Sequence, residues 1–154
     1  MIETEKHPVP FCFERYDDFL GFVVSQSGYR LGRSLALGIK RAGFKITPRE
    51  FAILNRLNQY GPLNQSQLAQ ITYKDRPATT RMIDKLEALG YVRRQASKKD
   101  RRAFDISLTR SGKEVRDKIV PAAVENIEIG CKGISRSDLL VTLRTLQLIN
   151  ANLA

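Results

Sequence analysis

The side chains of this sequence that could do chemistry are mainly lysines and arginines, and they gather in one stretch. Residues 72–102 contain ten Lys or Arg and four Asp or Glu, a net charge of +6, whereas the other 123 residues carry only +4. A cationic surface of this kind fits a polyanion, either nucleic acid or an acidic membrane surface. A solvated helix face is the simpler alternative. Because the excess is confined to one stretch that also contains turn and helix signals, we favour a binding surface.

Residues for catalysis or metal binding do not form a recognisable set. The single histidine, His7, lies in an N-terminal leader, and Cys12 and Cys131 are the only cysteines. The sequence offers no Ser-His-Asp combination, no cluster of metal ligands and no glycine loop for phosphate. We therefore expect no enzymatic activity, no metal and no cofactor. We also expect each cysteine to be a buried or half-buried thiol rather than a redox switch.

The composition also argues against a membrane or secreted protein. No apolar run approaches the ~20 residues that cross a bilayer, and the N-terminus lacks the apolar core of a secretory signal. We therefore expect a cytoplasmic protein with no membrane partner.

Apolar periodicity and helix-capping residues predict six helices and two strands around the basic stretch. A long helix is expected over residues 14–42, with one apolar face and four internal glycines that hint at close helix packing, although surface glycines are an equal alternative. Side-chain caps mark five further helices, and glycines or Gly-Pro end them. These caps are Thr47, Asn64, Asp75, Thr109 and Ser135.

The two strands are expected at residues 91–94 and 104–108, joined by a polar turn, and a kink is expected near Pro121. A short helix, a turn, a basic helix and a β-hairpin in this order predict a winged helix-turn-helix. The fold class is thus mainly α, with a small β-hairpin wing.

Four segments follow from this arrangement. Residues 1–12 are expected to form a flexible leader, 13–45 an N-terminal dimerisation helix, 46–109 the winged helix-turn-helix, and 110–154 the C-terminal dimerisation helices. A monomer would leave the apolar faces of the long terminal helices largely exposed, so we expect a homodimer.

From about Leu20 to Leu153 the sequence resembles the MarR family of bacterial transcriptional regulators, most densely between Ile46 and Gly112. The matching motifs are ITPREFAILNRL, LNQSQLAQIT, DRPATTRMIDKLEALGYVRR and KKDRRAFDISLTRSGKEV. The resemblance implies a homodimer joined through the first and the last two helices. It also implies binding to a palindromic operator on double-stranded DNA, usually as a repressor, and often release by a small aromatic or anionic effector or by oxidation.

A DNA-binding site is predicted on two neighbouring helices. In the helix after Asp75, Thr79 faces the core by periodicity, so the opposite face would meet the major groove. Arg81 is the preferred candidate for a base contact, with a phosphate clamp or a surface salt bridge as alternatives. The start of the preceding helix suits phosphate contacts. The residues predicted on the two helices are Asn64, Gln65, Ser66, Arg76, Pro77, Thr80, Arg81 and Lys85.

The turn of the β-hairpin supplies the other predicted contact. Lys98, Lys99, Arg101 and Arg102 can follow the DNA backbone and reach the narrow minor groove. The resemblance implies that Arg101 enters the groove, with Asp100 and Arg102 bracing the loop. A solvated basic turn is the alternative, and the sequence does not decide which arginine enters.

The trigger for release is not predicted, and no effector-binding residue is assigned. The branch of the family that senses organic hydroperoxides has its cysteine in a Leu-Cys-Phe setting, where this sequence has Leu20-Gly21-Phe22. Cys12 lies nine residues earlier than Gly21, which argues against that mechanism. A winged helix that binds only proteins is the rival to DNA binding, and salt-sensitive binding to duplex DNA separates the two.

Overall fold

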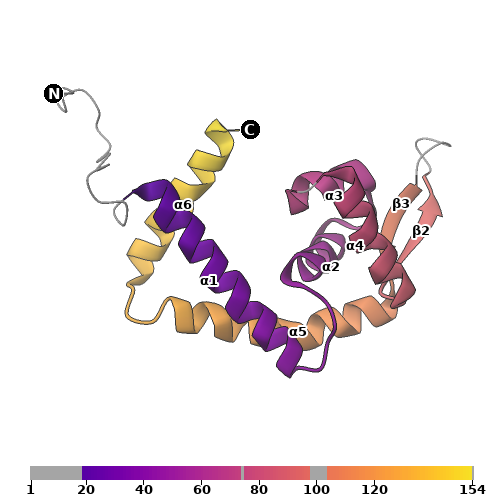
Figure 1. Ribbon diagram of the computed structural model, residues 1–154, viewed down its shortest axis with the longest axis horizontal. Coiled ribbons are helices and arrows are strands. Elements are labelled where there is room, and N and C mark those ends of the chain that lie inside the picture. Colours follow the sequence, from indigo (N-terminus) through magenta and orange to yellow (C-terminus); the bar gives the residue numbers. More distant parts are fainter. Residues whose placement is uncertain (1–18, 74, 98–103, 154) are drawn as a thin grey trace.

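The computed structural model describes residues 19–73, 75–97 and 104–153, which form two lobes joined by one long helix (Figure 1). One lobe is the winged helix-turn-helix. The other is an extended arm made by the first helix, the second half of the joining helix and the last helix. In order, the elements are α1 (Leu20–Arg41), α2 (Pro48–Tyr60), β1 (Leu63–Asn64), α3 (Gln65–Thr72), α4 (Arg76–Ala88), β2 (Val92–Ala96), β3 (Phe104–Leu108), α5 (Arg110–Gly130) and α6 (Arg136–Asn152).

Side-chain caps begin five of these helices at the residues that the sequence indicates. Thr47 and Asn64 each form a full capping box, accepting from the backbone N–H of Glu50 and of Gln67. Asp75, Thr109 and Ser135 cap α4, α5 and α6 through the same third-residue contact. Each cap satisfies a backbone donor that has no partner inside its helix. The predicted helix starts are therefore confirmed.

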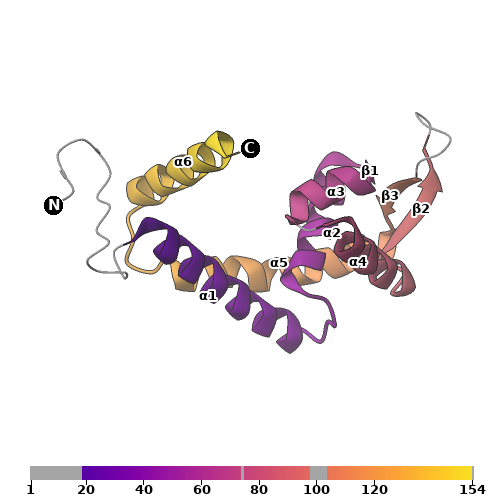
Figure 2. The ribbon, with the colours of Figure 1, turned by 45° about the horizontal axis from the view of Figure 1, so that its top comes forward.

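The sheet has one strand more than the sequence predicts. Its order is β1-β3-β2, with both pairings antiparallel, and Figure 2 shows β1 beside α3. Leu63 pairs with Ile106, while Val92 and Ala96 pair with Leu108 and Phe104. The prediction of β3 is confirmed, and β2 lies over 92–96 rather than 91–94.

The hydrophobic core fills the winged helix-turn-helix and continues onto α5. Its buried side chains come from every element of that lobe, including Leu54, Leu68, Ile83, Val92 and Ile106. The first half of α5 adds Val115 and Ile119. Burial of these large aliphatic side chains packs α3 and α4 against the sheet.

The first helix packs closely against the second half of α5. A Cβ on Gly38 would lie 3.3 Å from the Cβ of Ala122, whereas one on Gly28 or Gly32 would meet nothing within 4 Å. Near this contact the Asn126 amide donates to the Leu31 carbonyl at 3.2 Å. Close helix packing through glycine is thus confirmed at Gly38 and not at Gly28 or Gly32.

The arm contains the start of the first helix and the end of α5. The first helix starts later than predicted: Phe19, its N-cap, has an extended backbone at φ −75° and ψ 117°, so α1 begins at Leu20 and not at residue 14, which lies outside the described residues. Helix α5 continues through Pro121, where the predicted kink stays a prediction. Cys131, the C-cap of α5, is half-buried, as expected. No helix in the described part of the chain is long and apolar enough to cross a membrane.

Candidate nucleic-acid interface

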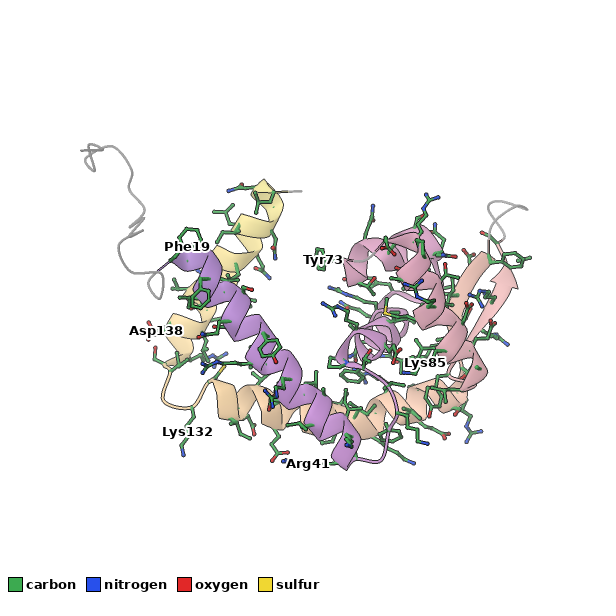
Figure 3. The ribbon with its side chains drawn as sticks, viewed as in Figure 1. Phe19, Arg41, Tyr73, Lys85, Lys132 and Asp138 are labelled. Carbon is green, nitrogen blue, oxygen red and sulfur yellow. The ribbon has the colours of Figure 1, made fainter. Side chains whose placement is uncertain are left out.

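The helix-turn-helix turn joins α3 to α4 through an unusual backbone conformation. Tyr73, which ends α3, adopts the left-handed region at φ 51° and ψ 41°, and its side chain is 84% exposed (Figure 3). Asp75 then caps α4 by accepting from the N–H of Ala78 at 2.7 Å. This turn directs the first turn of α4 outward from the lobe.

The first two turns of α4 present the predicted contact residues on one exposed face. Arg76, Pro77 and Arg81 are exposed, and Thr80 is half-buried. Thr79 is fully buried and donates from its hydroxyl to the Asp75 carbonyl at 2.9 Å, which confirms its predicted core position. Side chains of arginine at the start of an outward helix can reach base edges or phosphates in the major groove.

The start of α3 is linked directly to this face of α4. The Gln65 amide donates to the Thr80 hydroxyl, which in turn donates to the Arg76 carbonyl at 2.9 Å. Asn64 uses its side-chain oxygen for the cap, accepting from Gln67 N–H at 2.9 Å, while Ser66 is exposed. The structure therefore brings the predicted residues of both helices together.

Lys85 has an internal partner. Its Nζ lies 2.8 Å from Oε2 of Glu50, a carboxylate that is 4% exposed and also accepts from the Thr47 N–H at 2.7 Å. Lys85 extends from α4 toward α2 (Figure 3). The pair ties the third turn of α4 to the start of α2, so the charge of this lysine is partly committed to Glu50.

Arg94 on β2 forms the largest charged network of the described residues. Its Nη2 lies 2.5 Å from Oδ1 of Asp84, and its Nη1 donates to Oε2 of Glu87. The Arg94 backbone N–H also donates to Oε1 of Glu87, at 3.0 Å. Burial lowers the pKa of the guanidinium, but the hydrogen bonds and charges of Asp84 and Glu87 outweigh it and raise the pKa above its usual value.

The start of α4 and the open ends of the hairpin strands lie on the same side of the lobe. In Figure 1 the start of α4 and the open ends of β2 and β3 both point to the upper side. The predicted turn residues lie outside the described residues, so their roles stay predictions: Lys98, Lys99, Asp100, Arg101 and Arg102.

Sequence reasoning missed two features of this surface. Tyr73 carries no sequence signal for a left-handed turn, where glycine or asparagine is usual. In the sequence, Arg94 is recognisable only as one of the cations of the basic stretch. The acids at 84 and 87, separated from Arg94 by the glycine turn at Gly90, are a signal that could have paired it with α4.

Known proteins share both the sequence and the fold. The MarR family model matches residues 46–104. YkoM, an HTH-type transcriptional regulator of Bacillus subtilis, is 35% identical over 106 residues, 68% of this chain and 68% of that protein. A probable transcriptional regulator from Pseudomonas aeruginosa is 29% identical at a TM-score of 0.74, covering 91% of this chain and 100% of its own.

A further solved structure shares the fold. The repressor CouR, solved bound to a 23-mer DNA duplex, superposes at a TM-score of 0.78 with 23% identity, over 87% of this chain and 94% of its own. The family match and the 35% identity to YkoM show that the chain belongs to the MarR family, as a DNA-binding winged helix-turn-helix transcription regulator.

Proposed function

We propose that this regulator binds a palindromic operator as a homodimer and represses transcription from it. The observation that carries the proposal is the exposed start of α4, capped by Asp75 and aimed away from the lobe on the same side as the hairpin. CouR, whose name gives it as a repressor, has this fold and holds a 23-mer duplex, which supports the same use of the surface here.

Each predicted residue then has a role in the complex. Arg81 contacts a base in the major groove, and Arg76 and Pro77 lie beside it. The Thr80 hydroxyl holds the Gln65 amide in place against the DNA backbone. Asn64 and Ser66 place the first amides of α3 at a phosphate. Because Lys85 is paired with Glu50, we assign it to bracing α4, with any DNA contact secondary. The hairpin turn places Arg101 in the minor groove, braced by Asp100 and Arg102 and flanked by Lys98 and Lys99.

Operator binding is tested by fluorescence anisotropy with DNA from the gene's own upstream region. We expect tight wild-type binding that weakens by orders of magnitude between about 50 and 200 mM salt, because neutralised phosphates release counterions. At either salt concentration, Arg101→Ala should bind the operator more weakly than wild type. Lys118→Ala, which removes an exposed charge on α5, should bind it as wild type does. Equal affinity for operator and random duplex would contradict a sequence-specific operator.

An exposed apolar surface on the arm supports the homodimer. Helix α6 buries none of its residues, and Leu140, Val141, Leu143 and Leu148 are exposed, with Leu143 at 52%. The second half of α5 adds Val124, Ile127 and Ile129. Soluble monomers rarely leave this much apolar surface uncovered, because such surface is usually buried against a partner. A second copy that covers it would also space two α4 helices for a palindrome, with half-sites about one helical turn apart.

Charge placed on this patch should disrupt the dimer. We expect wild-type protein to sediment at twice its chain mass of 17.5 kDa and Leu143→Glu to sediment nearer to one chain, with loss of tight operator binding. Gln59→Glu adds the same charge at an exposed polar position of α2, outside the arm, and should stay dimeric. A Leu143→Glu protein that remains a dimer would show that α6 does not form the interface.

Release by a small aromatic or anionic effector stays a prediction of the family resemblance. A hollow of about 400 Å³ between α2 and α5 is large enough for such a molecule. Its wall combines apolar Phe51, Val120 and Val124 with Arg116, whose Nε donates to Asn55 at 2.9 Å. Repeating the operator titration with benzoate and salicylate tests this, since an effector would lower the anisotropy. Unchanged anisotropy with both acids would argue against this class.

A further inference from the structure

The recognition helix carries two carboxylates close to its proposed DNA-binding face. Asp84 lies three residues after Arg81 and four after Thr80, and residues at these spacings share one face of a helix. Glu87 lies one turn further on. Unpaired carboxylates here would repel the phosphates of a bound duplex.

Arg94, in the middle of β2, forms ion pairs with both carboxylates. Its planar guanidinium gives separate nitrogens to Asp84 and Glu87, and its backbone N–H holds the second oxygen of Glu87. The side chain is 26% exposed, so these charge-assisted bonds are partly shielded from water and salt. Contacts from two directions define one orientation of β2 against the last two turns of α4.

We propose that Arg94 is a positioning residue that couples the wing to the recognition helix through Asp84 and Glu87. This inference rests on the proposed function, in which α4 reads the major groove and the hairpin turn reaches the minor groove of one half-site. The two arms can engage one DNA only if their relative placement is fixed. The network joins β2 to α4 on the C-terminal side of Arg81. It acts by holding these two elements in place rather than by touching DNA.

The proposal is distinct from two simpler roles of Arg94. A direct phosphate contact would need a positive charge at position 94, whatever the partner on α4. A general stabilising role would change operator affinity only as far as it changes the melting temperature. A coupling role needs the ion pair itself, in either polarity, and it affects operator preference in protein that remains folded.

The test compares Arg94→Gln with the reversed pair Glu87→Arg/Arg94→Glu, made together with Asp84→Asn so that the new carboxylate at position 94 does not face Asp84, and uses Arg110→Gln as a control. Arg110 pairs with Glu114 at 3.1 Å in an exposed ion pair at the start of α5. Operator and random-duplex affinities are measured by anisotropy at a temperature where all variants are folded. Hydroxyl-radical footprinting reports the minor-groove contact of the wing.

Arg94→Gln should lose roughly tenfold or more in operator affinity, comparable to losing one good base contact. Its preference over random DNA should shrink, and the minor-groove protection should weaken. The reversed pair should recover most of the affinity and the protection, and the control should match wild type. If Arg94→Gln does not fold, the same recovery in the folded reversed pair still supports the coupling.

Two results would overturn the inference while leaving the proposed function intact. One is an operator affinity of Arg94→Gln equal to that of wild type, in an assay in which Arg81→Ala does lose affinity. The other is a folded reversed pair that binds as weakly as Arg94→Gln, which would place the arginine on a phosphate. If wild-type protein shows no operator preference, the proposed function fails, and the coupling falls with it.

Discussion

Arg81→Ala is expected to remove most of the preference of this regulator for its operator while leaving its fold intact. Arg81 is exposed on the second turn of α4, and its neighbours Thr79 and Ile83 are fully buried, so α4 stays anchored without it. An arginine that holds guanine through two hydrogen bonds is worth about 1–3 kcal/mol of discrimination. The expected loss of operator affinity is therefore roughly 10- to 100-fold.

The binding of random DNA distinguishes the two possible roles of Arg81. If it contacts a base, affinity for random duplex should change little, and the preference should collapse at the base pair that it reads. If it clamps a phosphate, both affinities should fall together and the salt dependence should lose about one unit of slope. Arg41→Ala removes an exposed charge at the far end of α1 (Figure 3) and should leave binding unchanged.

Features that depend on nearby residues could be predicted from the sequence. The caps at Thr47, Asn64 and Asp75 involve partners only three residues away, so residue types at that spacing identify them. The buried position of Thr79 followed from helical periodicity alone. The basic, outward face of α4 was predicted for the same reason.

Features that depend on distant partners could not be predicted in the same way. The strand β1 has two residues, and it exists because Leu63 meets Ile106 in β3. Lys85 reads as one more exposed cation of α4 until Glu50, thirty-five residues earlier, is placed beside it. Arg94 likewise reads as part of a charge run, although its guanidinium is committed to two carboxylates of α4.

The same distinction governs Gly112, which looks in the sequence like an ordinary residue at the start of a helix. Gly112 is the third residue of α5, where its N–H donates to the Thr109 hydroxyl at 3.0 Å. A Cβ at this position would lie 2.0 Å from the carbonyl oxygen of Tyr91 and 2.9 Å from Cδ1 of Leu108. The first of these is a backbone atom just before β2, so a side chain cannot relieve the overlap.

Gly112→Ala should therefore destabilise the protein, although alanine favours a helix by about 0.5–1 kcal/mol over glycine. The Tyr91 carbonyl also accepts from the Thr109 N–H at 3.0 Å, so any shift would disturb the junction of the hairpin and α5. Overpacking of a filled site costs about 1–3 kcal/mol and sometimes more. We expect the free energy of unfolding to fall by about 2–3 kcal/mol and the melting temperature by about 5–10 °C.

Thermal and urea denaturation of Gly112→Ala beside Ser111→Ala measure this effect. Ser111 is the exposed neighbour in the same helical turn, and its substitution should change stability by less than about 0.5 kcal/mol. Equal stability of the two variants would mean that α5 and the start of β2 are further apart than the structure places them. Since Tyr91 precedes β2 and Leu108 ends β3, Gly112→Ala should also weaken operator binding below its melting temperature, because the hairpin and α4 would no longer keep their relative placement.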